Sequence, residues 1–148
     1  MSDESILNPW RLRKCVLPQH TDHAGVMWHG SYLSWLEEAR VDALEQVGLP
    51  YKDLVAKGFE LPVVSLNINY TKSLFHGESV LLESYSQPRK LARWPWSTKF
   101  IAKGSVVAEA SVYLVLVRRL GDKHKLIRNI PNEFASYFLK LQLGPNLE

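Results

Sequence analysis

Hydrophobic residues recur along this chain with two different periods, and the longer period predicts one long helix. Between Tyr32 and Val47 the apolar positions are three or four residues apart, which is the spacing of one helix face. They are Tyr32, Leu36, Ala39, Ala43 and Val47. We expect a helix over Tyr32–Val47 with Ser31 as its N-cap, because serine oxygens commonly accept first-turn amides. Gly48 and Pro50 are typical of the end of a helix.

Much of the remaining chain is rich in β-branched and aromatic residues and predicts strands. The first strand covers Trp10–Leu17 and ends at Pro18, which cannot donate to a strand ladder. Four more segments are bounded by glycine or proline turns. These are Leu61–Thr71, Ser79–Gln87, Trp94–Ala102 and Val106–Arg119. Within the third segment, Trp94 and Trp96 alternate and should share one face, as core or interface residues or as contacts to a substrate.

Short turns and two further helical segments complete the pattern. Lys103-Gly104-Ser105 and Gly121-Asp122-Lys123 predict hairpin turns. Helical spacing returns in Tyr51–Lys57 and after Pro131, over about residues 131–142. The order of strand, long helix, four strands and closing helix predicts an α+β fold with a mostly antiparallel sheet. One helix covers only one face of such a sheet, so we expect the other face or an edge to pair with a second copy.

Composition adds limits to this picture. With 148 residues, 46% hydrophobic and 22% charged, the chain suits a single domain over residues 1–148. The longest uncharged apolar stretch, Val112–Val117, is far too short to span a bilayer, and Met1–Trp10 lacks the pattern of a signal peptide. We therefore expect a cytoplasmic protein without stable membrane insertion. Cys15 is the only cysteine, which excludes an internal disulfide and any multi-cysteine zinc site.

Charge and motifs narrow the class of function. The balance of 18 basic and 15 acidic residues is too mild to indicate nucleic-acid binding, although basic residues between 89 and 103 would suit an anionic small molecule. The chain lacks a Walker loop, a GxGxxG motif after a strand, a GxSxG elbow and an HExxH helix. It has three histidines within ten residues, His20, His23 and His29, but their spacing fits no common zinc site.

One loop combines groups that could carry chemistry. Asp22 and Gly25 precede the start of the long helix, where backbone N–H groups lack acceptors and can bind a developing oxyanion. A nearby carboxylate could act as a base or a nucleophile. An aspartate at this place is also a common cap or turn former. Arg40, within the apolar helix face, is interpreted as structural.

The same loop carries a resemblance to a known family. The segment Thr21–Leu33, followed by Leu36–Arg40, resembles the signature of hotdog-fold acyl-CoA thioesterases of the 4-hydroxybenzoyl-CoA thioesterase family. Val63–Tyr70 resembles that family's second strand and Phe75–Glu78 its following turn. The resemblance covers roughly residues 11–131. It implies a hotdog fold, a five-stranded antiparallel sheet wrapped round one long central helix, with a core over about 10–131 and a C-terminal helix over about 131–142.

The resemblance also implies roles for particular residues. Asp22 would be the nucleophile or general base, the backbone N–H of His29 would polarise the thioester carbonyl, and Gly25 would allow close approach of the loop to substrate. The implied substrate-binding residues are Tyr32, Lys72, Arg89, Lys90 and Arg93, the basic ones toward the phosphates of coenzyme A. No metal and no cofactor are implied.

Several alternatives remain beside an acyl-CoA thioesterase. They are a non-catalytic module that binds acyl-CoA or acyl-carrier protein, an acyl-carrier-protein thioesterase, and a hotdog dehydratase, whose His-Phe-Pro motif is absent. The expected assembly is a homodimer or a dimer-of-dimers tetramer, with sites between subunits. Nucleic acid is not an expected partner.

Overall fold

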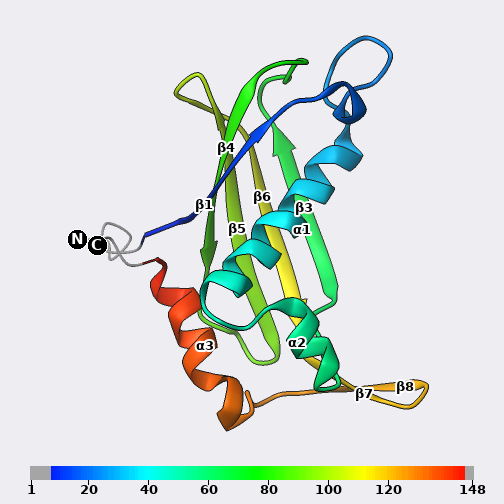
Figure 1. Ribbon diagram of the computed structural model, residues 1–148, viewed down its shortest axis with the longest axis vertical. Helices are drawn as coiled ribbons and strands as arrows, with labels where there is room; N and C mark the ends of the chain where they lie inside the picture. The colour runs from blue at the N-terminus through cyan, green and yellow to red at the C-terminus, as the bar shows by residue number, and fades with distance from the viewer. Residues whose placement is uncertain (1–7, 146–148) are drawn as a thin grey trace.

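The computed structural model describes residues 8–145 and contains a curved five-stranded sheet with a long helix across one face (Figure 1). The strands of this sheet are β1 (Trp10–Cys15), β3 (Val63–Tyr70), β4 (Ser79–Ser86), β5 (Arg93–Ala102) and β6 (Ser105–Val115). Their order is β1-β4-β5-β6-β3, and all neighbours are antiparallel. The predicted α+β layout with an antiparallel sheet is confirmed.

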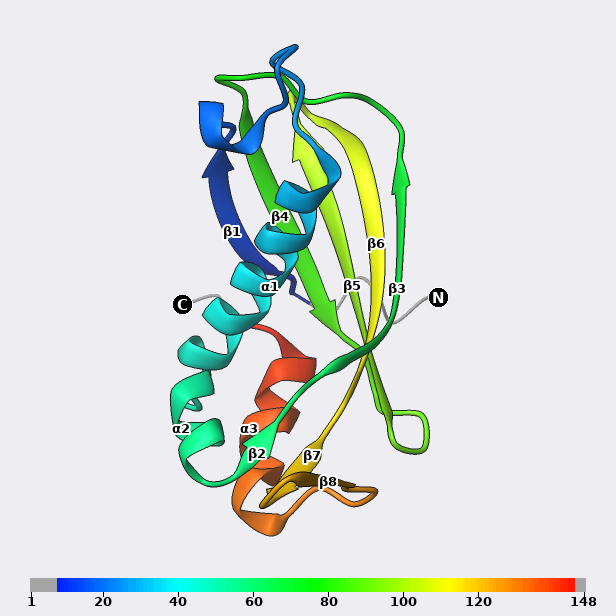
Figure 2. The same ribbon diagram turned by 90° about the vertical axis from the view of Figure 1, so that its right-hand side faces the viewer.

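The three α-helices follow from local sequence patterns, whereas the 3₁₀ helix was not predicted. The helices are the short 3₁₀ helix η2 (Pro18–His20), α1 (His29–Gln46), α2 (Tyr51–Ala56) and α3 (Asn132–Leu143). All five residues of the predicted apolar stripe on α1 are buried, which confirms its orientation. Figure 2 shows α1 and α3 on the same side of the sheet. In the described residues, none of these helices is long and apolar enough to cross a membrane.

The core is built on the face of β5 that the helices cover. Trp94, Trp96 and Phe100 are buried at alternate positions of this strand, as the period-two pattern requires. The Trp94 ring meets the Phe138 ring of α3 with centroids 4.3 Å apart, and its Nε1 donates to Ser86 Oγ at 2.7 Å. Both indoles therefore belong to the core, which was one of the two interpretations of their spacing.

The start of the long helix differs from the prediction. It begins at His29 with Trp28 as N-cap, so Ser31 lies inside the first turn and its assignment as N-cap was wrong. Ser31 is buried, and its Oγ donates to the carbonyl of His20 at 3.0 Å. Its hydroxyl is thus used to hold the preceding loop against the helix and is not available as a cap.

The end of the strand region also differs. The segment Val106–Arg119 is not one strand, because β6 ends at Val115 and β7 (Val117–Leu120) joins a second sheet. That sheet has the order β2-β7-β8, with β2 at Phe59–Glu60 and β8 at Lys123–Leu126. Buried Leu116 separates the two strands where the backbone changes partners. The predicted turn at Gly121 is confirmed as the β7–β8 connection.

Candidate functional site

The loop before α1 is closed by its own backbone hydrogen bonds. Thr21 and Met27 form an antiparallel bridge, and the N–H of Asp22 donates to the carbonyl of Val26 at 2.8 Å. Gly25 takes φ of +80° within this loop, where L side chains are strained. A Cβ at Gly25 would meet no described atom within 4 Å, so the requirement for glycine comes from backbone conformation and not from crowding.

The carboxylate of Asp22 is fixed on one side and free on the other. Its Oδ1 accepts the N–H groups of Ala24 at 2.8 Å and Val26 at 3.1 Å. Its other oxygen has no hydrogen-bond partner in the described part of the chain, and the residue is exposed. Asp22 is therefore a turn former, and within residues 8–145 one of its oxygens is left unpaired and open to other groups.

The start of α1 supplies donors beside this loop. The N–H of Trp28 donates to the carbonyl of His20 at 3.2 Å, and that of Ser31 to the carbonyl of Trp28 at 3.0 Å. Between them, the N–H of His29 has no acceptor within residues 8–145. As a first-turn amide at the positive end of an 18-residue helix, it can stabilise negative charge on an oxygen.

A cavity of about 250 Å³ opens beside the helix start. His29 and Tyr32 of α1 line it together with Tyr70 and Lys72 at the end of β3. The ring of Tyr32 packs edge-on against that of Tyr70, with centroids 4.9 Å apart. Burial, followed by the effects of Tyr70 and Glu78, raises the pKa of Tyr32 to about 12, so its hydroxyl stays protonated at neutral pH.

Three of the residues expected in the site thus line one cavity: His29, Tyr32 and Lys72. Asp22 and Gly25 lie outside its lining, in the adjoining loop. The bridge between Thr21 and Met27 keeps that loop at the mouth of the cavity, because Met27 belongs to the lining.

The predicted basic group lies elsewhere. Arg93 is opposite Val115 on β6, whereas Tyr70 is opposite Ala108 on the same strand. Seven strand residues separate these two positions, or roughly 24 Å at about 3.4 Å per residue. Within one chain, the structure therefore keeps Arg93 and its neighbours Arg89 and Lys90 away from the cavity.

All three of these basic residues also make structural contacts. Lys90 and Arg93 exchange backbone hydrogen bonds of 2.8 and 3.0 Å across the β4–β5 turn. The guanidinium of Arg89 donates to the carbonyls of Ala92 at 3.4 Å and Ile127 at 3.1 Å. Burial lowers the pKa of Arg89 from its ordinary value.

A second cavity, of about 260 Å³, was not anticipated from the sequence. It lies between Glu37 and Arg40 of α1 and residues Leu61–Val63 at the start of β3. Arg40 makes no ion pair or side-chain hydrogen bond within the described residues, and burial lowers its pKa, with Glu37 partly opposing the shift. The spacing of Glu37, Arg40 and Leu44 on one helix face was the signal that could have predicted it.

The histidines near the loop have separate surroundings. His20 Nδ1 accepts the N–H of Leu17 at 3.0 Å, and its ring packs against Trp35 with centroids 5.2 Å apart. Over residues 8–145, the structure brings no three His, Cys, Asp or Glu side chains together in a way that could hold a metal ion.

Known proteins resemble this chain over nearly its whole length. The family model described as the thioesterase-like superfamily matches residues 16–137. A Synechocystis sp. protein named as an esterase is 33% identical over 140 residues, which cover 94% of this chain and 84% of the relative. A Bacillus subtilis protein named as an acyl-CoA thioesterase is 37% identical over 65 residues, 44% of this chain and 47% of the relative.

Solved structures share the same arrangement of sheet and helices. The DHNA-CoA thioesterase of Staphylococcus aureus superposes with a TM-score of 0.77 at 29% identity, covering 86% of this chain and 87% of that one. A 4-hydroxybenzoyl-CoA thioesterase in complex with 4-hydroxybenzoyl-CoA has a TM-score of 0.77 at 18% identity, covering 86% and 96%, and this likeness concerns the fold alone.

Proposed function

The chain belongs to the thioesterase-like superfamily, and we propose that this thioester hydrolase acts on an acyl- or aroyl-CoA, releasing the free acid and CoA. Its five-stranded sheet and long helix form a hotdog fold. The coenzyme A substrate is supported by the names of two relatives, an acyl-CoA thioesterase and a DHNA-CoA thioesterase.

The proposed chemistry rests on one observation. Within residues 8–145, a carboxylate oxygen of Asp22 and the backbone N–H of His29 at the adjoining helix start both lack hydrogen-bond partners. Asp22 attacks the thioester carbonyl, or it takes a proton from a water that attacks in its place. The N–H of His29 donates to the carbonyl oxygen as negative charge develops there, and the thiolate of CoA leaves and is protonated. Water completes the first route by hydrolysing the mixed anhydride formed with Asp22.

The cavity beside the helix start is proposed to take the group next to the thioester. Tyr32 and Tyr70 give it an aromatic wall, which suits the apolar part of an acyl or aroyl group. Lys72 at its rim provides a positive charge for a phosphate of coenzyme A.

A second copy of the chain is proposed to complete the site by pairing along β3. This strand is at the edge of the sheet, and Val64 and Leu66 are 48% and 42% exposed. An exposed apolar edge strand has free backbone groups and favours pairing with another strand. A two-fold axis through the middle of β3 would pair this strand with the β3 strand of a second copy in antiparallel orientation. The resulting assembly is a homodimer.

The two-fold axis would also bring separated features together. One cavity lies at the start of β3, by Leu61–Val63, and the other lies at its end, by Tyr70–Ser73. The two positions are symmetric about the centre of the strand, so the first cavity of one subunit would adjoin the second cavity of its partner. The same operation moves the β4–β5 hairpin of the partner, with Arg89, Lys90 and Arg93, to the end that holds Asp22.

The Asp22→Asn variant tests this function. The amide oxygen of asparagine can still accept the N–H groups of Ala24 and Val26, so the loop should keep its shape. The asparagine amide is a poor nucleophile and a poor base. We therefore expect the rate of hydrolysis to fall by a factor of roughly 10² or more, which is the scale of losing one catalytic group. The measurement is release of CoA thiol from short-chain, long-chain and aromatic acyl-CoAs.

The matched control is Asp53→Asn, an exposed carboxylate on α2. It should leave the rate within a factor of two. Unchanged hydrolysis by Asp22→Asn would remove Asp22 from the mechanism. Absence of turnover by the unmodified protein with every acyl-CoA would refute coenzyme A as the thiol carrier.

A further inference from the structure

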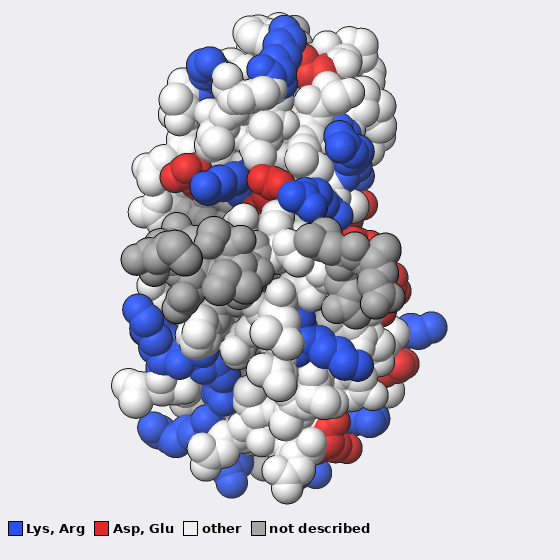
Figure 3. Space-filling view, turned by 90° about the vertical axis from the view of Figure 1, so that its left-hand side faces the viewer, with Lys and Arg blue, Asp and Glu red and all other residues white. Residues whose placement is uncertain are grey.

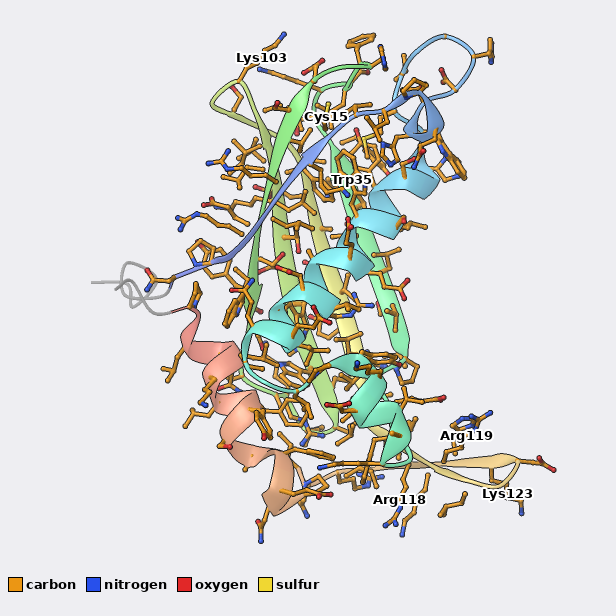
Figure 4. The ribbon with its side chains drawn as sticks, viewed as in Figure 1. Cys15, Trp35, Lys103, Arg118, Arg119 and Lys123 are labelled. Atoms are coloured by element: carbon orange, nitrogen blue, oxygen red, sulfur yellow. The ribbon has the colours of Figure 1, made fainter. Side chains whose placement is uncertain are left out.

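A basic hairpin of the second sheet lies at the end of the main sheet opposite the Asp22 loop. It consists of β7 and β8, and Figure 4 shows Arg118, Arg119 and Lys123 on it, away from the helix and sheet core. Lys125 adds a fourth basic side chain, and Asp122 in the turn is the hairpin's single acidic residue. Figure 3 faces the side of the molecule away from this hairpin, and it shows further basic atoms at the lower left with few acidic atoms among them.

On one face of this hairpin the basic side chains contact an acidic residue, and on the other face, in the part of the chain that the structure describes, they do not. On one face, Glu60 of β2 contacts Arg119 Nη1 at 3.9 Å and His124 Nε2 at 3.1 Å. On the other face, Arg118 is directly opposite Lys125, and Leu120 is directly opposite Lys123. No ion pair within the described residues involves Arg118, Lys123 or Lys125. We call the second set, Arg118, Leu120, Lys123 and Lys125, the uncompensated face.

The uncompensated face is unfavourable for the isolated chain. Like charges directly opposite each other in an antiparallel pair destabilise it. The guanidinium of Arg118 lies over the Phe59 ring, 5.6 Å from its centroid, so it stays close to the hairpin. Leu120 is 52% exposed among these cations. Such a surface gains stability when a partner supplies negative charge together with an apolar contact.

We propose that the uncompensated face docks an acidic acyl carrier protein, which presents its acyl thioester to the active site. This proposal rests on the proposed thioesterase function, and it names a second source of thioester beside CoA. Three cations around one exposed leucine complement a protein surface that carries acidic and apolar side chains together. The phosphates of a nucleic acid would use the cations but not the leucine.

The position of the hairpin agrees with this role. β7 follows the end of β6, near Val115, far from the cavity of its own chain. In the homodimer proposed above, the antiparallel pairing of the β3 strands places this end beside the Asp22 loop of the partner subunit. A carrier protein on one subunit's hairpin would then deliver its acyl group to the other subunit's site.

The test compares two substrates that carry the same acyl group. Lys123→Glu/Lys125→Glu reverses two charges, and the new Glu at 125 faces Arg118, so the hairpin should remain folded. With a bacterial acyl carrier protein charged with the best acyl group from the CoA panel, we expect KM to rise about tenfold. With the acyl-CoA, KM and kcat should stay within a factor of two. Adding sodium chloride should raise KM for the carrier-protein substrate more in the unmodified enzyme than in the variant, because salt screens the charges that remain on the hairpin.

The control is Arg13→Glu/Lys140→Glu, which makes the same change of net charge at exposed positions of β1 and α3. In this variant, KM and kcat for both substrates should stay within a factor of two of their values in the unmodified enzyme. Equal losses with both substrates in the hairpin variant, or no loss with the carrier protein, would overturn the docking proposal while acyl-CoA hydrolysis stands. A third outcome would also overturn the proposal. The unmodified protein would bind anionic vesicles or RNA through the hairpin charges, while the hairpin variant would show no difference between the carrier-protein thioester and the acyl-CoA.

Discussion

At the scale of single residues, the start of α1 depends on Gly30. The indole of Trp28 lies so close to this glycine that a Cβ there would overlap the ring. Trp28 is 46% exposed, and its ring packs edge-on against that of His29 with centroids 5.2 Å apart. The indole therefore lies next to the amide proposed to bind the oxyanion, and Gly30 makes room for it.

Replacing Gly30 by alanine should separate activity from stability. The new methyl group displaces the indole, and we expect kcat to fall roughly tenfold or more, because small displacements near reacting atoms are costly. Alanine favours a helix over glycine by about 1 kcal/mol, so the melting temperature should not fall. The measurements are steady-state kinetics and thermal unfolding.

The double variant Trp28→Ala/Gly30→Ala provides the comparison. If overlap with the indole causes the loss, Gly30→Ala should cost nothing further in a Trp28→Ala background. A loss of the same size in both backgrounds would mean that the glycine acts through the backbone of the helix.

At the scale of elements, α1 is held by the stripe that its sequence predicts and by buried neighbours such as Leu44. The helix reaches from the Asp22 loop to the second cavity, so its packing fixes both ends of the proposed site. Its three-residue and four-residue spacing was enough to identify the buried face. The first residue of α1 could not be predicted in this way, because it depends on hydrogen bonds that Trp28 and Ser31 donate to the carbonyl of His20 across the folded loop.

Leu44→Ala tests how much the packing of α1 contributes. Leu44 is 1% exposed, and truncation of such a side chain leaves a cavity, so we expect a loss of about 2–5 kcal/mol in the free energy of unfolding. Chemical denaturation measures this loss. Val55→Ala on the exposed side of α2 should change it by no more than about 0.5 kcal/mol, and equal losses would contradict the burial pattern.

At the scale of the whole molecule, β3 is the strand that we propose joins two copies of the chain, each of which has an incomplete site. Leu66 is opposite Val112 of β6 and lies near the middle of β3, where the proposed two-fold axis passes. Each subunit carries the Asp22 loop at one end and the basic β4–β5 hairpin at the other. A monomer would thus have the proposed catalytic groups without the basic residues proposed for the phosphates.

Leu66→Lys should therefore affect assembly and activity together. A two-fold axis places the two introduced charges near each other, so we expect the dimer to dissociate and kcat/KM for acyl-CoA to fall at least roughly tenfold. Light scattering after size-exclusion chromatography measures the first effect, and the thiol assay measures the second. Leu139→Lys, on the exposed side of α3, should change neither. A fully active Leu66→Lys monomer would refute a shared site.

The sequence by itself determined the three α-helices, the approximate positions of the five main strands, and the buried faces of the long helix and of the strand with Trp94, because these follow from the spacing of apolar residues along a few turns or a single strand. The alternation around Trp94 and Trp96 and the turn at Gly121 are of this local kind. The family resemblance, and not the spacing, favoured Asp22 as a catalytic group over a turn former. In the structure its Oδ1 forms the turn, and its other oxygen has no hydrogen-bond partner among the described residues.

Only the tertiary structure decided how these parts meet. It ended β6 at Val115, it separated Arg93 from the Asp22 loop, and it revealed the cavity beside Arg40. It also placed the indole of Trp28 against Gly30 and left one face of the β7–β8 hairpin without acidic partners among residues 8–145. Each of these features depends on strand register or on the position of a side chain in the packed structure. The local spacing of apolar residues in the sequence determines neither the register nor that position.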